Sequence, residues 1–168
     1  MKKIFLIGRR RTGIKTIQKA LQVLKYKKSS MLLDSKSLDI KDIIKDMKGL
    51  DICAIVKDYT MNDVRAIEAA YPNSTFILTE RHSDIWYASF VRYYGTLKGE
   101  HPQTVHTNKG HFVSSFYEGF NRDIKTHFHG REWKLLNIVL DGSHSWQSIC
   151  SYLKKATPKS SFPHENRS

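Results

Sequence analysis

The chain has 168 residues, 40 % of them hydrophobic, and a formal net charge of +12 from 28 Lys and Arg against 16 Asp and Glu. This length supplies the apolar mass for one core and excludes a large multidomain assembly, so we expect a single domain over residues 1–168. The positive charge favours an anionic partner such as a nucleotide, a phosphorylated or sulfated ligand, nucleic acid or a membrane surface.

The cysteines and the apolar runs of the sequence bear on whether the protein is cytoplasmic, exported or membrane-spanning. The only two cysteines, Cys53 and Cys150, lie in apolar stretches, which excludes a disulfide framework and a cysteine-based zinc site. The apolar run at residues 4–7 is broken at Gly8 and is too short for an export signal. No stretch approaches the roughly 20 apolar residues of a membrane helix. We therefore expect a cytoplasmic protein without a membrane span.

Strands and helices alternate in the predicted chain order. The apolar run at 4–7 indicates a buried parallel strand, and the helical spacing of Ile14, Ile17, Leu21 and Leu24 indicates a helix from about residue 13. The further predicted elements are a helix at 38–47, a strand at 52–56, a helix at 62–70, a strand at 75–79, a helix at 83–93, a loop at 96–110, a helix at 113–128, a strand at 135–140, a helix at 145–153 and a polar tail from 157.

This alternation predicts an α/β fold with three layers, α/β/α, around a mostly parallel central sheet. Such sheets bind ligands at the carboxyl ends of their strands. The segments to inspect are therefore those that follow the first three predicted strands.

The turn after the first strand contains two glycines and several basic or hydroxyl side chains, from Gly8 to Thr16. A glycine-containing turn that opens a helix presents free backbone N–H groups and the positive helix end to a phosphate. The nucleotide-binding Walker A pattern requires adjacent Gly and Lys, but Ile14 separates Gly13 from Lys15. The turn predicts a phosphate site in a P-loop NTPase-like fold, with an ordinary basic βα connection as the alternative.

This turn resembles the 5′-phosphosulfate loop of sulfotransferases, commonly Pro-Arg/Lys-Thr/Ser-Gly-Thr-Thr. Arg11, Thr12 and Gly13 match that loop, whereas Arg10 replaces its proline and Ile14 and Lys15 replace its two threonines. The resemblance implies binding of 3′-phosphoadenosine 5′-phosphosulfate (PAPS) or its product 3′-phosphoadenosine 5′-phosphate (PAP). The implied contacts of the turn are Arg10, Arg11, Thr12, Gly13, Ile14, Lys15 and Thr16.

A second segment, after the third strand, carries the same resemblance. In sulfotransferases an arginine at this strand end and a serine eight residues later hold the 3′-phosphate, and Arg81 and Ser89 have that spacing. Taken singly, each would be an ordinary surface or helix residue. Tyr71-Pro72 and Trp86 also resemble the family, and we expect Trp86 to pack in the core. The resemblance extends to the Phe162-Pro163-His164 tail.

The resemblance also implies catalytic roles. Arg11 takes the place of the family's basic residue beside the leaving 5′-phosphate, where its charge would be electrostatic because arginine keeps its proton. Tyr59 falls where cytosolic sulfotransferases carry a catalytic histidine, and Asp58 precedes it. An aspartate is the better base near neutral pH, so we predict Asp58 as the base, with a strand-end cap as the alternative.

Histidines cluster in and after the predicted loop at 96–110, but they lack metal-ligand spacing, and we expect no metal site. The loop is a candidate lid, whose Lys98, His101, His106 and Lys109 could meet an acidic acceptor.

The sequence thus favours a sulfotransferase that moves a sulfuryl group from PAPS to a hydroxyl or amine of a small molecule or glycan. Two alternatives remain open. One is a P-loop kinase, and the other is a catalytically weak relative that binds nucleotide or RNA through its basic surface. No aromatic-rich RNA motif supports the RNA interpretation.

Overall fold

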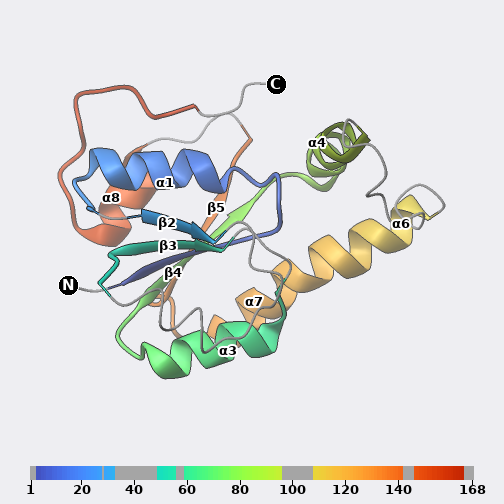
Figure 1. Cartoon of the computed structure of the whole chain (residues 1–168), viewed down its shortest axis with the longest axis horizontal. Coiled ribbons are helices and arrows are strands. Elements are labelled where there is room, and N and C mark those ends of the chain that lie inside the picture. The colour runs from blue at the N-terminus through green and yellow to red at the C-terminus, as the bar shows by residue number, and fades with distance from the viewer. Residues whose placement is uncertain are drawn as a thin grey trace.

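A five-stranded sheet runs through the centre of the molecule, with helices on both faces (Figure 1). The computed structural model describes residues 3–27, 29–32, 49–55, 59–95, 108–141 and 146–164. Its elements are β1 (Ile4–Ile7), α1 (Ile14–Val23), β2 (Ser29–Leu32), β3 (Ile52–Ile55), α3 (Met61–Ala70), β4 (Thr75–Glu80), α4 (Ser83–Gly95), α6 (Lys109–His111), the π-helix η1 (Phe112–Gly119), α7 (Phe120–Phe128), β5 (Leu135–Val139) and α8 (Trp146–Leu153).

The strand order is β2-β3-β1-β4-β5, and every strand pair is parallel. Every side chain of β1, β3 and β4 is buried, as expected for strands covered on both faces. The α/β fold class, with a parallel central sheet of the P-loop NTPase-like type, is confirmed.

Each face of the sheet has its own hydrophobic core. On one face, Leu6 and Ile77 pack with Ile17 of α1 and Ile149 of α8. On the other face lie Phe5 and Phe76 with residues of α3 and α7, and Phe128 of α7 is 4.9 Å from Phe76 between ring centroids. This arrangement confirms the three predicted layers.

Most predicted boundaries agree with the structure, and β2 is the strand that the sequence analysis missed. Its sequence, Ser-Ser-Met-Leu, is short and lacks both the apolar run and the alternation that predict a strand. It is added as an edge strand by pairing with β3. The predicted helix at 38–47 lies outside the described residues, as does the predicted loop except for residues 108–110, where α6 begins. None of the described helices is long and apolar enough to cross a membrane.

The helix predicted at 113–128 begins earlier, in α6, and takes the wider π form over the eight residues of η1. Aromatic side chains of η1 pack against α4 in a third cluster, whose buried members include Trp86, Phe90 and Tyr117. In Figure 1, α4 and α6 extend beyond the sheet near the end where β4 stops. This third cluster therefore lies next to the strand end where a ligand is expected.

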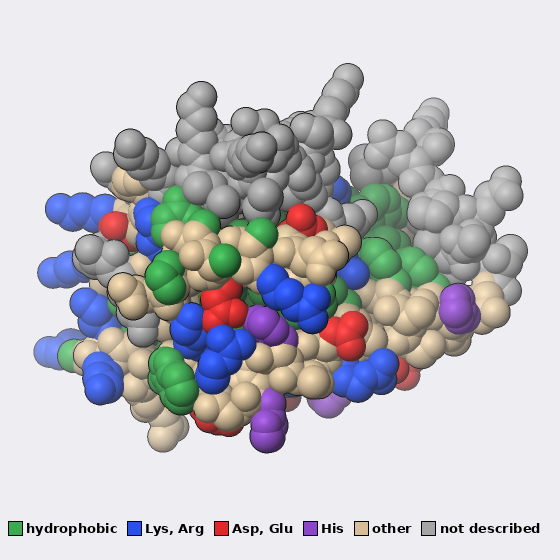
Figure 2. Space-filling model, turned by 90° about the horizontal axis from the view of Figure 1, so that it is seen from below, with side chains coloured by type: hydrophobic (Ala, Val, Ile, Leu, Met, Phe, Trp, Pro, Cys, Tyr) green, Lys and Arg blue, Asp and Glu red, His purple; other side chains and the backbone are tan. Residues whose placement is uncertain are grey.

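An ion cluster joins α3 to α7 and to the start of β5. Glu68 of α3 accepts hydrogen bonds from Arg131 and, at 2.7 Å, from Lys134, and it pairs with His127 at 2.7 Å. Burial alone would raise the pKa of Glu68, but the hydrogen bonds from Lys134 and His127 and the charges of Lys134 and Arg131 lower it overall. Figure 2, which views this side of the molecule, shows basic, acidic and histidine side chains next to one another.

We expect Glu68→Gln to lower the free energy of unfolding by about 1–3 kcal/mol in a urea titration, because it removes a mostly buried charge that faces several cations. A lowered pKa in the folded state means that the carboxylate stabilises the fold above its ordinary pKa and loses that effect as the pH falls through the folded value. The difference from wild type should therefore shrink at acidic pH. The exposed Glu132→Gln is the matched control, and an equal loss in both variants would contradict this role.

Candidate functional site

The turn between β1 and α1 lies at the carboxyl end of the sheet and has an unusual backbone. Gly8, Arg11 and Gly13 all have positive φ values, of 149°, 69° and 94°. A Cβ at Gly8 would lie 2.7 Å from the carbonyl oxygen of Thr79, so only glycine lets the end of β1 approach the end of β4 this closely. The turn is therefore held in one conformation against the neighbouring strand.

Buried hydroxyl groups stabilise the inside of this turn. The Thr12 hydroxyl donates to the carbonyl of Arg9 at 2.6 Å and lies 2.7 Å from the Thr79 hydroxyl. The Tyr59 hydroxyl accepts the Gly8 N–H at 2.6 Å. Burial raises the pKa of Tyr59 well above its ordinary value, although the hydrogen bond with Gly8 and the charge of Arg9 oppose the rise. Thr12 and Tyr59 thus shape the turn from within.

The start of α1 offers donors to a ligand. The N–H groups of Thr16 and Ile17 are both used by the carbonyl of Gly13. The N–H groups of Gly13, Ile14 and Lys15 make no hydrogen bond to another described residue. Such free N–H groups at the positive end of a helix dipole bind anions.

The side chains of these helix residues point to different surroundings. Ile14 packs in the core with 5 % of its surface exposed, so this residue offers a ligand only its backbone N–H. Thr16 is also buried, and Lys15 is exposed. Lys15 is therefore the basic side chain of this first turn that is open to solvent.

The segment after β4 meets the β1–α1 turn directly. Arg11 donates from Nε to the hydroxyl of Ser89 on α4 at 3.1 Å, and its guanidinium lies 5.0 Å from the ring centre of Tyr93. The pKa of Arg81 is lowered by burial and then by the positive charge of Arg11. Arg11, Arg81 and Ser89, predicted from two distant parts of the sequence, therefore belong to one electropositive site.

Two arginine side chains have unfilled hydrogen-bonding capacity. The Nε groups of Arg10 and Arg81 are both buried and have no hydrogen-bond partner among the described residues. Arg81 also forms no ion pair with a described carboxylate. A buried charged donor without an acceptor is costly unless a ligand supplies one, and guanidinium groups match phosphate or sulfate oxygens.

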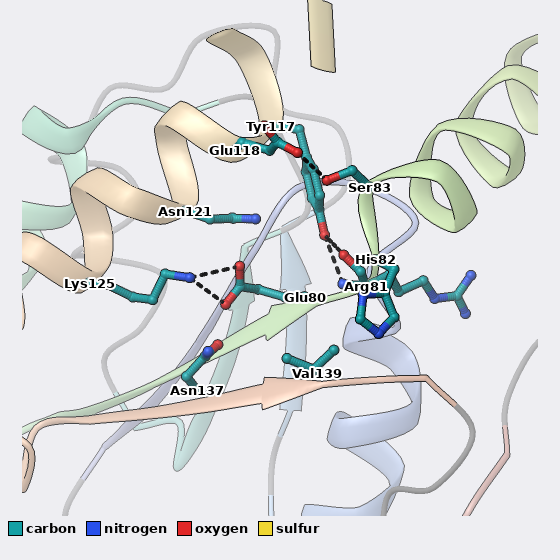
Figure 3. A pocket seen from close by; sticks show the side chains of 10 residues that line it. All are labelled: Glu80, Arg81, His82, Ser83, Tyr117, Glu118, Asn121, Lys125, Asn137 and Val139. Atoms are coloured by element: carbon teal, nitrogen blue, oxygen red, sulfur yellow. Dashed lines mark hydrogen bonds and ion pairs between the residues drawn. The ribbon is translucent and has the colours of Figure 1, made fainter. Parts of the chain in front are cut away.

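A stacked pair of aromatic rings contacts the backbone of both the β1–α1 turn and the segment after β4. Trp86, which is fully buried as expected, lies parallel to Tyr117 with 4.1 Å between ring centroids. The Trp86 indole donates to the carbonyl of Arg10 at 2.9 Å. The Tyr117 hydroxyl accepts the Arg81 N–H and donates to the Arg81 carbonyl, each at 2.7 Å (Figure 3). One ring pair therefore fixes the backbone beside both arginines.

Comparison with known families identifies the chain. A family model described as "Sulfotransferase domain" matches residues 3–110 and 94–168, which together span nearly the whole sequence. The protein belongs to the sulfotransferase domain family. A search of curated proteins found no match to this chain.

The sulfotransferase domain brings predicted site residues from two segments into contact, whereas other predicted residues lie outside the described part of the chain. Arg11 contacts Ser89 and lies near enough to Arg81 to lower the pKa of Arg81. The predicted base Asp58 and the predicted lid residues Lys98, His101 and His106 lie outside the described residues.

Sequence reasoning missed Tyr117, because nothing marks it within an amphipathic helix pattern as a partner of Arg81. It also missed Arg9, whose Nε donates to the Phe116 carbonyl at 3.0 Å and whose guanidinium contacts two aromatic rings of the long helix.

Tyr117→Phe should lower the free energy of unfolding by about 1–3 kcal/mol, because it leaves the buried N–H and carbonyl of Arg81 without their shared partner. Burial raises the pKa of Tyr117 to about 12, so the hydroxyl is protonated and donates at neutral pH. Urea unfolding measures the loss. Tyr26→Phe, at a partly buried tyrosine in another cluster, is the control. A Tyr117→Phe protein as stable as wild type would contradict the stabilising role of the two hydrogen bonds between the Tyr117 hydroxyl and the Arg81 backbone.

Proposed function

We propose that this sulfotransferase domain acts over residues 1–168 as a single-domain, cytoplasmic enzyme that transfers a sulfuryl group from PAPS to a hydroxyl or amine acceptor. The observation that carries the proposal is the contact between Arg11 and Ser89, 78 positions apart in the chain, with Arg81 beside them. It brings the two predicted phosphate-binding segments together at the carboxyl end of the sheet. A nucleotide with anionic groups at both its 5′ and 3′ positions fits two such segments.

The residues divide between the two anionic ends of PAPS. The N–H groups of Gly13, Ile14 and Lys15, with the Lys15 side chain, would hold the 5′-phosphosulfate. Arg81 and Ser89 would hold the 3′-phosphate. The unsatisfied Nε groups of Arg10 and Arg81 support this assignment because each needs an oxygen acceptor.

Two threonines of the turn are buried. Thr12 is fully buried and its hydroxyl is used inside the turn, so its support for the ligand is indirect, through the shape of the backbone. Thr16 is buried as well, with its N–H bonded to Gly13. Ile14 and Lys15 stand where the family's loop commonly has its two threonines, so at these positions the chain would rely on backbone N–H groups and the Lys15 side chain.

Arg11 is the residue we assign to stabilisation of the leaving group. PAPS supplies the activated sulfuryl group, and negative charge develops on the 5′-phosphate side as that group departs. Arg11 has a left-handed backbone and donates to Ser89, which orients its guanidinium before any ligand binds. Because arginine keeps its proton, its contribution is electrostatic.

We propose Asp58 as the base that accepts the acceptor's proton. Its neighbour Tyr59 is unsuited to this role because burial raises the pKa of its phenol and the hydroxyl is already bonded to Gly8. Asp58→Asn should leave PAP affinity nearly unchanged and lower turnover by about 100-fold or more, measured with an acceptor found by screening hydroxyl and amine compounds, acidic glycans included. Equal turnover in wild type and variant would remove Asp58 from the mechanism.

Calorimetric titration with PAP tests the cofactor site. We expect binding that is independent of magnesium and stronger than binding of ATP. Arg81→Ala should weaken PAP binding by about 10- to 100-fold, because a charge-assisted contact to the 3′-phosphate is lost. Adenosine 5′-phosphosulfate, which lacks that phosphate, should bind wild type and Arg81→Ala with similar affinity.

Arg65→Ala, at an exposed arginine of α3, is the matched control for loss of one positive charge and should bind PAP like wild type. If PAP affinity fell equally in both variants, Arg81 would contribute only through its net charge and not through a specific contact. A magnesium-dependent preference for ATP would favour the kinase alternative. Binding to RNA with a steep salt dependence and none to PAP would favour the non-enzymatic one.

A further inference from the structure

A cavity of about 270 Å³ lies at the carboxyl ends of β4 and β5 (Figure 3). Its walls include residues of β4, β5, η1 and α7 and of the segment after β4. The lining residues are Glu80, Arg81, His82, Ser83, Tyr117, Glu118, Asn121, Lys125, Asn137 and Val139. Val139 is 41 % exposed, because the side of β5 that faces the cavity is left uncovered near the strand's end. The cavity is therefore open to a small molecule.

The cavity is separate from the proposed PAPS site. Glu80 points toward α7, where it meets Lys125, whereas the preceding Thr79 bonds Thr12 on the α1 side of the sheet. Figure 3 shows the Arg81 guanidinium directed away from the cavity, to which this residue contributes near its backbone. A ligand in the cavity would thus meet a different set of groups from those that bind PAPS.

Asn121 supplies the observation that points to a ligand. Only 2 % of its surface is exposed, and its side chain lies close enough to the Tyr117 hydroxyl to lower the pKa of that phenol, against the larger effect of burial. Its Oδ1 atom has no hydrogen-bond partner among the described residues. Figure 3 shows the side chain directed into the space between Tyr117 and Glu80. A buried amide oxygen without a donor is costly, so this position calls for an N–H or O–H from a bound molecule.

The charges around the cavity also favour a donor. Lys125 bonds both oxygens of Glu80, at 3.1 and 3.2 Å, and so balances one carboxylate. Glu118 is a second carboxylate of the wall, which accepts a hydrogen bond from Ser83 and has no described cation paired with it. Arg81 and His82 also line the cavity, but Arg81 directs its guanidinium away from it (Figure 3), so Glu118 is the lining carboxylate without a described partner cation.

We propose that this cavity binds a compact molecule with several hydroxyl groups and a primary ammonium group, of the amino-sugar class. The ammonium group meets Glu118 and Asn121 Oδ1, and the hydroxyls donate to the remaining oxygens of the wall, including the Asn137 amide. Binding at this cavity requires no PAPS, so this proposal can be tested independently of the proposed sulfuryl transfer.

The test uses glucosamine as the probe, with glucose and glucose 6-phosphate as comparisons, in NMR titrations of the full chain. Glucosamine should shift the amide signals of Glu80, Asn121 and Val139. It should bind at least about tenfold more tightly than glucose 6-phosphate, whose anionic group is repelled by the unpaired carboxylate of Glu118. Asn121→Leu should weaken glucosamine binding by about tenfold or more, because the buried acceptor is lost.

Val139→Trp fills the cavity from an exposed position and should abolish glucosamine binding while leaving PAP affinity unchanged. Val23→Trp, at a similarly exposed valine of α1, is the matched control and should bind glucosamine like wild type. The proposal is overturned if glucosamine causes no shifts at the cavity, if glucose 6-phosphate binds as tightly, or if Val139→Trp binds glucosamine as wild type does.

Discussion

The stacking of Trp86 on Tyr117 is the interaction on which the candidate site depends. The two rings come from α4 and η1, and each places one polar group on a different arginine-bearing segment. Aromatic stacking contributes about 0.5–1.5 kcal/mol beyond burial, and the hydrogen bonds of the two polar groups add to it in a dry environment. Within η1, the carbonyl of Phe116 accepts a hydrogen bond from Arg9, and the hydroxyl of the next residue, Tyr117, donates to the carbonyl of Arg81.

The parallel sheet supplies the second constraint. β1 and β4 are neighbours, and Ile7, the last residue of β1, is in register with Leu78, two residues before the end of β4. The turn that begins at Gly8 must then pack against Thr79, and the absence of a side chain at Gly8 permits that approach. Arg11 and Ser89 meet because these two strand ends meet. Burial of the arginines then makes their unfilled donors costly and suited to an anion.

Much of this could be read from the sequence, and the remainder depends on tertiary packing. Apolar runs and helical spacing predicted β1, β3, β4, β5 and most helices, because those patterns record which faces are buried. The glycines and arginines of the first turn, with Arg81 and Ser89, predicted where an anion would bind. β2 escaped prediction because its pairing with β3, and not its composition, makes it a strand.

The supporting residues of the site were not predictable in the same way. Tyr117 and Arg9 act through contacts with segments far away in the chain, at separations of 36 and 107 positions. Ile14 replaces a hydroxyl residue of the family's loop and packs in the core, as its helical spacing with Ile17 and Leu21 indicated, so its predicted contact with the cofactor reduces to its backbone N–H. The cavity beside β5 is likewise lined by residues of β4, α7 and β5 that lie far apart in the chain, and no local motif marks it.

A crystal structure of the protein with bound PAP would test the central claim most directly. The account predicts the 3′-phosphate within hydrogen-bonding distance of Arg81 and Ser89, and the 5′-phosphate on the N–H groups of Gly13, Ile14 and Lys15. PAP bound elsewhere, or with neither phosphate in contact with these two segments, would contradict the claim that they form one cofactor site.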